Sequence, residues 1–201
     1  VFAITGSNGK TSVKNLLLAV MQHAAAVLGQ HVYATPGNRN NEIGLPLAVI
    51  DAPEDADFAI YEMGTGKPGD IAYLTAIAAP DVSIVNNVAP AHLEAFASLD
   101  GIAHEKAAIV DGLEPGGVAV LPADLPVSHI LMAKAAEVGA KTFTFGEISG
   151  STYRMAQVQI GNEATVVQAD RAGKPFLYKV MSPGRHFAAN GLGIGISYTR
   201  P

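Results

Sequence analysis

The sequence has no cysteine, no long apolar run and no excess of basic residues. The missing cysteine excludes disulfide bonds and thiolate metal sites, and it is compatible with a reducing cytoplasm. No apolar segment is long enough to span a bilayer, so membrane insertion is not expected. The formal net charge of −5 at pH 7 argues against broad binding to nucleic acid or membrane surfaces, which usually requires a basic face.

The chain does have enough apolar residues for a substantial core. With 201 residues, 49% of them hydrophobic, it can form one domain, or one domain with a small appendage. Its first residues, Val1 to Ile4, have the pattern of a buried strand and not of a basic, then apolar, signal segment. A natural protein rarely starts inside a core strand, so we expect residues 1–201 to be an excised domain.

Strand and helix patterns alternate along most of the chain. Buried strands are expected at residues 1–5, 32–35, 57–62, 81–86, 117–121 and 141–145, and helices at 11–28, 69–79, 98–113 and 127–138. After Gly146, shorter segments at 153–160, 164–169 and 176–180 predict antiparallel strands, followed by a helix near 187–198. The pattern predicts an α/β fold like that of P-loop NTPases: a mainly parallel sheet flanked by helices, with a small antiparallel β extension near the C-terminus. Three glycines, at 191, 193 and 195, weaken the last expected helix by roughly 1 kcal/mol each relative to alanine.

The first expected strand leads directly into the string TGSNGKTS. The strict phosphate-loop pattern GxxxxGK[ST] is not met, because it would require a glycine in place of Ile4. A compressed version remains, made of Gly6, Ser7, Asn8, Gly9, Lys10, Thr11 and Ser12. Gly6 and Gly9 allow backbone N–H groups to point at phosphate oxygens, and the following helix adds its positive N-terminal end. Lys10 can reach the terminal phosphates and the Thr11 hydroxyl can bind Mg²⁺. The alternative is an ordinary glycine turn.

A phosphate loop that binds Mg²⁺ needs a further oxygen ligand, and Glu62 is the candidate. It ends the apolar segment DFAIYE, where an acid in this architecture faces the loop across the carboxyl edge of the sheet. Mg²⁺ prefers a few carboxylate or hydroxyl oxygens together with phosphate and water. The alternative is a solvated acid at a strand end. GTPases commonly have aspartate here, and the guanine-reading string Asn-Lys-x-Asp is absent, so GTP is disfavoured.

Three further segments carry candidate polar residues: a loop after the strand at 81–86, the expected helix at 98–113, and the loop after the strand at 32–35. His92 lies in the proline-bearing string IVNNVAPAHLEAF at the sheet edge, which favours a ligand or positioning role. Lys106, in HEKAAIV, either forms a salt bridge with Glu105 or faces the phosphate site, and spacing does not separate the two. The asparagine-rich string TPGNRNNEIGLP at 35–46 is either a turn-rich connector or a loop that contacts substrate.

Five strings together resemble the Mur ligases, the ATP-dependent amide-forming enzymes of bacterial peptidoglycan synthesis. They are ITGSNGKTSVK, TPGNRNNEIGLPL, YEMGTGKPGDI, IVNNVAPAHLEAFASLDGIAHEKAAI and PGRHFAANGL, and they run from the first residues to near the last. The chain resembles the central ATPase domain of the branch that joins D-alanyl-D-alanine to UDP-N-acetylmuramoyl-tripeptide. The resemblance implies a monomeric cytoplasmic enzyme in which ATP converts a peptide carboxylate into an acyl phosphate. The amine of D-alanyl-D-alanine then attacks it, and ADP and phosphate are released.

The resemblance also implies roles for single residues in phosphate and metal binding. By it, the loop from Gly6 to Ser12 holds the ATP phosphates, with Lys10 on the transferred group. Thr11 and Glu62 bind one Mg²⁺, and His92 stands where the family binds a second metal ion.

Other residues receive roles by the same resemblance. Lys106 stands where several members carry a carbamylated lysine, and Asn190 stands where the last helix contacts adenine. The residues that the resemblance places near the UDP-tripeptide are Asn38, Asn40 and Asn41.

Members of the family also carry an N-terminal domain that binds the UDP-sugar and a C-terminal domain that closes over ATP. Residues 1–201 match neither, so we expect the isolated chain not to complete the reaction. The alternatives are another Mur-type or a folylpolyglutamate-type amide ligase, and a nucleotide-binding module without catalysis. A P-loop kinase or switch is a further alternative, which would transfer phosphate to a hydroxyl or prefer GTP.

Overall fold

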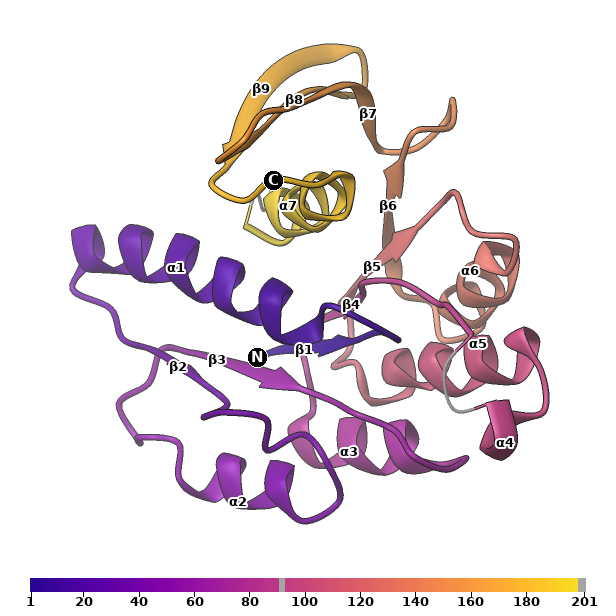
Figure 1. The fold of residues 1–201 in the computed structure, drawn as a ribbon. Helices are drawn as coiled ribbons and strands as arrows, with labels where there is room; N and C mark the ends of the chain where they lie inside the picture. Colours follow the sequence, from indigo (N-terminus) through magenta and orange to yellow (C-terminus); the bar gives the residue numbers. More distant parts are fainter. Residues whose placement is uncertain (91–92, 199–201) are drawn as a thin grey trace.

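The computed structural model describes residues 1–90 and 93–198, and in this part of the chain nine strands form one sheet (Figure 1). Their order across the sheet is β2-β3-β1-β4-β5-β6-β7-β8-β9. The strands are β1 (Phe2–Thr5), β2 (Val32–Ala34), β3 (Phe58–Glu62), β4 (Val82–Val85), β5 (Val118–Pro122), β6 (Lys141–Gly146), β7 (Tyr153–Ile160), β8 (Thr165–Arg171) and β9 (Lys174–Val180). Neighbours from β2 to β7 pair in parallel, whereas β7, β8 and β9 pair antiparallel. The predicted α/β fold with an antiparallel extension is confirmed.

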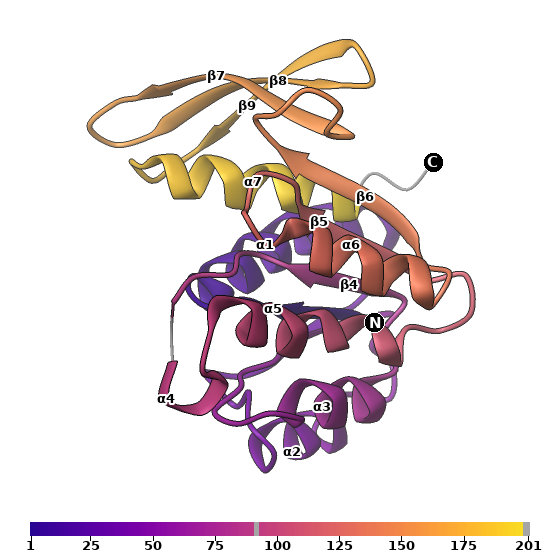
Figure 2. The same ribbon diagram turned by 90° about the vertical axis from the view of Figure 1, so that its right-hand side faces the viewer.

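Helices cover both faces of the parallel part of the sheet. They are α1 (Lys10–Leu28), α2 (Gly44–Ile50), α3 (Asp70–Ala78), α4 (Leu93–Phe96), α5 (Leu99–Ala107), the 3₁₀ helix η1 (Ala108–Gly112), α6 (Ser128–Glu137) and α7 (Arg185–Tyr198). Figure 1 shows α1 and α7 on one face and α2 and α3 on the other. In Figure 2, α5 and α6 lie on the same face as α2 and α3, and β7–β9 curl over α7. Within the described residues, no helix combines the length and the apolar character needed to cross a membrane.

Successive side chains along a strand point to opposite faces of the sheet, so they belong to two separate hydrophobic cores. On β1, Phe2 and Ile4 join the core beneath α1 and α7, whereas Ala3 joins the core beneath α2, α3, α5 and α6. On β3, Ile60 and Tyr61 divide in the same way. Because central parallel strands are buried on both faces, they read in the sequence as continuous apolar runs.

The expected helix at 98–113 is the clearest error of element type, because its second half is a 3₁₀ helix. α5 ends at Ala107, and η1 continues to Gly112. The carbonyl of Ile109 accepts hydrogen bonds from Thr75 Oγ1 at 2.8 Å and from Ser83 Oγ at 3.1 Å. A Cβ on Gly112 would lie 2.5 Å from the Thr75 carbonyl oxygen. Contacts with α3 and β4 therefore determine the geometry of this segment.

Two short helices, α2 and α4, were not expected from the sequence. The start of α2 lies in the segment 35–46 that was interpreted as an asparagine-rich loop, and the helix begins where Asn41 Oδ1 accepts the backbone N–H of Gly44 at 2.7 Å. Leu45 and Ala48 of α2 are fully buried against the sheet. Tertiary burial thus stabilises a helix of seven residues that would be marginal in isolation.

The glycines of α7 do not prevent the predicted last helix, which begins at Arg185. A Cβ on Gly191 would lie 2.9 Å from Tyr178 Cε2 and 3.0 Å from Val180 Cγ2. Glycine at this position lets α7 pack closely against β9. The intrinsic cost of the glycine is offset by this packing, which helix propensity does not describe.

Candidate functional site

The phosphate loop, residues 6–12, connects the end of β1 to the first turn of α1. Gly9 has φ of 74°, in the left-handed region that favours glycine. A Cβ on Gly6 would lie 3.1 Å from Asn86 Cβ and 3.2 Å from the backbone nitrogen of Asn87, so this neighbouring loop leaves little room for a side chain at position 6. The first turn of α1 contains no acidic residue, and Gly9 supplies no side-chain cap. The N-terminal end of α1 is therefore suited to receive an anion.

Two asparagines after β4 support this loop. Asn86 Nδ2 donates to the backbone carbonyl of Asn8 at 2.8 Å, and Asn87 Oδ1 accepts the backbone N–H of Asn8 at 3.0 Å. Ser7 Oγ donates to the carbonyl of Ala89 at 2.9 Å. These contacts tie the phosphate loop to the segment after β4, and they give Asn86 and Asn87 a supporting role.

Lys10 lies over the loop to which it belongs. Its Nζ donates to the carbonyl of Gly6 at 2.9 Å, and the residue is partly buried. Burial lowers the pKa of Lys10, and the nearby Glu62 carboxylate opposes this effect. The Lys10 ammonium thus lies against the phosphate loop, where it can donate to a ligand oxygen in place of the Gly6 carbonyl.

Glu62 lies at the centre of the polar contacts at this edge of the sheet, and it is only 1% exposed. Thr11 Oγ1 donates to Glu62 Oε2 at 3.0 Å, and Asn40 Nδ2 donates to Glu62 Oε1 at 2.7 Å. Lys14 Nζ lies 3.5 Å from Glu62 Oε2. The structure therefore brings together Thr11 and Glu62, the pair predicted for Mg²⁺, and it adds Asn40 and Lys14.

The hard oxygens of Thr11 and Glu62 fit the ligand preference of Mg²⁺. In residues 1–90 and 93–198, no group of three or more His, Cys, Asp or Glu residues is arranged so that it could hold a metal ion. A metal ion at Glu62 would therefore take its remaining ligands from phosphate oxygens and water, as Mg²⁺ commonly does in nucleotide sites. His92, the candidate for a second metal ion, lies outside the described residues.

Lys106 follows Glu105 on α5, and its side chain is buried. Burial and the charge of Lys10 lower its pKa to about 8, with Glu105 acting in the opposite direction. The Glu105 carboxylate accepts hydrogen bonds from Gly69 N at 2.7 Å, Ile71 N at 2.8 Å and Thr65 Oγ1 at 3.1 Å. Glu105 thus anchors a neighbouring loop, and Lys106 lies within the electrostatic influence of Lys10.

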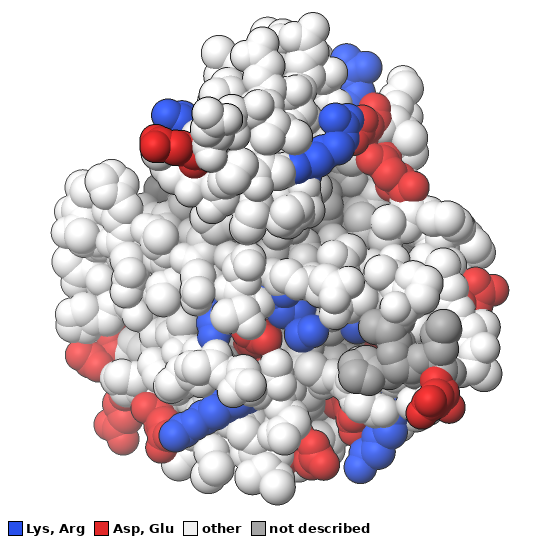
Figure 3. All heavy atoms as spheres, viewed as in Figure 1, with Lys and Arg blue, Asp and Glu red and all other residues white. Residues whose placement is uncertain are grey.

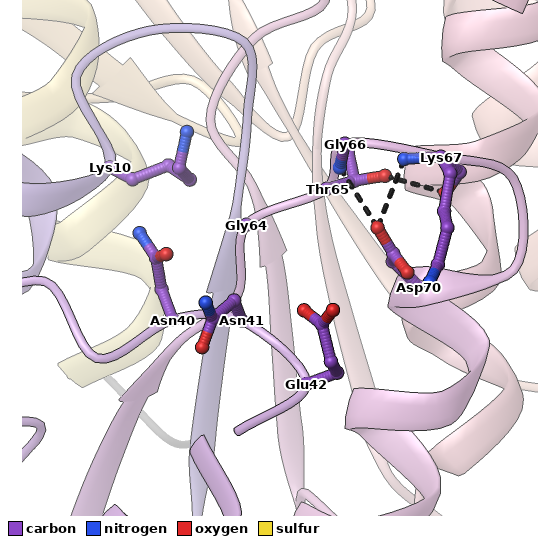
Figure 4. Close-up of a pocket in the computed structure, with 9 residues that line it drawn as sticks. All are labelled: Lys10, Asn40, Asn41, Glu42, Gly64, Thr65, Gly66, Lys67 and Asp70. Atoms are coloured by element: carbon purple, nitrogen blue, oxygen red, sulfur yellow. Dashed lines mark hydrogen bonds between the residues drawn. The ribbon is translucent and has the colours of Figure 1, made fainter. Parts of the chain in front are cut away.

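A pocket of about 440 Å³ opens between Lys10, the asparagine loop (residues 35–42) and the segment 64–70 (Figure 4). Its lining residues are Lys10, Asn40, Asn41, Glu42, Gly64, Thr65, Gly66, Lys67 and Asp70. Asp70 Oδ2 accepts the backbone N–H groups of Gly66 and Lys67 at 2.9 and 3.0 Å, which shapes the far wall. Figure 3 shows charged atoms of both signs in a recess near the centre of this face of the molecule.

A second pocket, of about 320 Å³, lies beside the phosphate loop and α7. Asn190 lines it together with Asn86, Asn87 and His186, and Asn190 itself is 6% exposed. A Cβ on Gly9 would lie 3.5 Å from Asn190 Nδ2. The first and the last helix of the chain thus meet at the phosphate loop, as the assignment of Asn190 to nucleotide binding requires.

Not every predicted site residue lies at these pockets. Asn40 and Asn41 line the first one, but Asn38 is exposed and does not belong to its lining. Sequence reasoning assigned no role to Lys14, and it considered Glu105 only as a salt-bridge partner of Lys106, not as the anchor of segment 64–70. A lysine at 14 is one helical turn beyond Lys10, and this spacing was the signal that could have found it.

The chain is similar in sequence to proteins of one family. A profile of the Mur ligase middle domain matches residues 4–195. The UDP-N-acetylmuramoyl-tripeptide–D-alanyl-D-alanine ligase of Escherichia coli is 33% identical over 196 residues, which cover 96% of this chain and 41% of that protein.

Solved structures give the same relationship. MurF from Acinetobacter baumannii has a TM-score of 0.88 at 25% identity, over 96% of this chain and 41% of its own. MurF from Thermotoga maritima, solved in complex with ADP, has a TM-score of 0.83 at 28% identity, over 98% of this chain and 44% of its own. This chain therefore spans less than half the length of each of these three proteins.

Proposed function

This chain belongs to the Mur ligase family, and we propose that it is the ATP-binding part of a ligase that joins D-alanyl-D-alanine to UDP-N-acetylmuramoyl-tripeptide. The observation that carries the proposal is the meeting of three segments at one sheet edge. The phosphate loop, Glu62 and the asparagine loop are joined there by the contacts of Thr11 and Asn40 with one carboxylate. The small-molecule partners of this function are ATP, the UDP-tripeptide and D-alanyl-D-alanine, and its setting is the bacterial cytoplasm.

Binding of the nucleotide follows from the groups at the phosphate loop. Backbone N–H groups of residues 6–12 and the N-terminal end of α1 receive the phosphates. The Lys10 ammonium exchanges the Gly6 carbonyl for a phosphate oxygen, and Asn190 contacts the base in the second pocket. Mg²⁺, when bound through Thr11 and Glu62, supplies neutralisation of charge on the phosphate oxygens.

The chemistry that follows is mainly positioning. A carboxylate oxygen of the peptide attacks the terminal phosphorus, the bond to ADP breaks, and an acyl phosphate forms. The neutral amine of D-alanyl-D-alanine attacks the acyl carbon, and the C–O bond to phosphate breaks as the amide bond forms. Phosphate leaves with the electron pair, and the proton that the nitrogen loses ends on phosphate. The first pocket lies beside Lys10 and is walled by Asn40 and Asn41, so it can hold the reacting carboxylate next to the phosphates.

We also propose that Lys106 carries a carbamate. Carbamylation requires the neutral amine, and a pKa of about 8 makes this form much more abundant near neutral pH than in an ordinary lysine. The modification would replace a charge that repels Lys10 with one that attracts it. His92 as a ligand of a second metal ion remains a prediction.

The substrate class is tested by saturation-transfer NMR on this chain with Mg-ADP present. We expect transfer to the peptide part of the UDP-tripeptide and none to dihydrofolate. Transfer to the folate alone would favour a folylpolyglutamate-type ligase, and transfer to neither would contradict the assignment of the first pocket. Because the relatives are more than twice as long, we expect no ligated product from this chain alone, and product formation would contradict that expectation.

A further inference from the structure

Lys14 is a buried charge that the proposed nucleotide chemistry does not use. Its exposure is 3%, and it is not among the residues that line the first pocket. Its Nζ donates to the backbone carbonyls of Thr35 at 2.9 Å and Gly37 at 2.6 Å, and it lies 3.5 Å from Glu62 Oε2. The three protons of the ammonium thus face three acceptors.

A second residue of the asparagine loop, Asn40, contacts the Glu62 carboxylate directly. Asn40 Nδ2 donates to Glu62 Oε1 at 2.7 Å, and the Asn40 carbonyl accepts the backbone N–H of Gly64 at 2.7 Å. A Cβ on Gly64 would lie 2.8 Å from Asn40 Oδ1, so the loop is packed tightly onto the end of β3. Lys14 binds the first part of the asparagine loop, at Thr35 and Gly37. Asn40 attaches the second part of the loop, which leads into α2, to Glu62. Both parts of the loop are thus connected to the Glu62 carboxylate, one through Lys14 and the other through Asn40.

A buried ammonium is rarely explained by stability alone. Replacing a buried ion pair by well-packed apolar groups is often neutral or stabilising, whereas removing one partner leaves an unpaired charge. Lys14 stands between three separate segments, namely α1, the asparagine loop and the end of β3. Its contacts make the position of the loop depend on the position of the carboxylate.

We propose that Lys14 is a positioning residue that joins Glu62 and the asparagine loop into one unit, so that nucleotide bound with Mg²⁺ at Thr11 and Glu62 also orders the loop on the substrate side. The inference rests on the proposed function for its nucleotide part. The anchoring of the loop by Lys14 does not depend on that function, because it is made only by contacts between residues of this chain.

Hydrogen exchange measured on the 201-residue chain, with and without Mg-ADP, tests both parts. Lys14→Met removes all three contacts while keeping a long side chain, and Lys14→Gln keeps donors for the carbonyls but no charge. Asn40→Ala releases the second part of the loop from a partly exposed position, which leaves a test if the Lys14 variants do not fold. Lys174→Met, at an exposed position of β9, is the matched control.

Without nucleotide, we expect amides of residues 35–42 to exchange about tenfold faster or more in Lys14→Met than in the unaltered chain, because hydrogen bonds from a charged donor are lost. We expect a smaller effect in Lys14→Gln and none in Lys174→Met. With Mg-ADP, we expect slower exchange of the same amides in the unaltered chain, and loss of this response in Lys14→Met and Asn40→Ala.

Unchanged exchange of the loop in a folded Lys14→Met variant would overturn the proposal, whether or not nucleotide binds. So would a loop response to Mg-ADP that survives both Lys14→Met and Asn40→Ala. Failure of the proposed function is recognised separately, because the unaltered chain would then show no protection by Mg-ADP at the phosphate loop itself.

Discussion

The hydroxyl of Thr11 donates a hydrogen bond of 3.0 Å to Glu62 Oε2, although 51 positions separate the two residues in the chain. Parallel pairing of β1 with β3, with Ile4 opposite Glu62, creates this contact. The strand that ends in the acid thus lies directly beside the strand that leads into the phosphate loop. Two groups suited to one Mg²⁺ are in place before a ligand arrives.

Glu62→Gln should weaken the Mg²⁺-dependent binding of ADP by at least about tenfold, because an amide oxygen is a poorer ligand for a hard cation than a carboxylate. The measurement is calorimetric titration of ADP at several Mg²⁺ concentrations. Circular dichroism must first show that the variant is folded, because Lys14 loses its buried counter-charge. Glu163→Gln, at an exposed position between β7 and β8, is the control. An unchanged Mg²⁺ dependence in folded Glu62→Gln would exclude Glu62 as a ligand.

Stability should rise with pH in alkaline solution because of Lys106. Burial and Lys10 lower its pKa in the folded chain from 10.5 to about 8. Between these values the unfolded chain binds more protons, so the free energy of unfolding increases with pH. The full difference corresponds to roughly 3 kcal/mol.

Urea denaturation between pH 7.5 and 10.5, in buffer free of CO₂, measures this contribution. We expect Lys106→Met to remove most of the rise, and Lys179→Met, at an exposed position, to retain it. A slope that is the same in Lys106→Met and in the unaltered chain would show that Lys106 has an ordinary pKa.

Two glycines of α7 should respond to alanine with opposite signs. In Gly191→Ala the new methyl group would meet Tyr178 and Val180 at 2.9 and 3.0 Å, and overpacking of this kind costs about 1–3 kcal/mol. In Gly195→Ala the Cβ meets no atom of the described residues within 4 Å, so the helix should gain up to about 1 kcal/mol. Thermal unfolding of the two variants makes the comparison. Equal effects would mean that α7 does not pack on β9 as described.

Much of this architecture could be predicted from the sequence, because periodicity reports burial. The central strands are apolar on both faces, and the string GSNGKTS combines glycines, a lysine and a hydroxyl in an order that few other structures require. The Asn190 assignment came from the family resemblance, and its proximity to Gly9 depends on how α7 packs, which local patterns do not encode.

The errors and omissions have a common physical cause. η1 is shaped by Thr75 and Ser83, which are distant in sequence, and α2 is stabilised by burial of Leu45 and Ala48. The sequence analysis gave Lys14 no role, because no local pattern shows that carbonyls of another segment surround it. Sequence patterns therefore gave element positions and the phosphate loop, whereas tertiary contacts decided how the site is held.

The most direct test of the account is calorimetric titration of Mg-ATP into this chain, with Lys10→Ala as the comparison. The account predicts saturable binding by the unaltered chain and loss of that binding in a folded Lys10→Ala variant. No binding by the folded, unaltered chain, or equal binding by the two proteins, would contradict the claim that residues 6–12 are a working phosphate site.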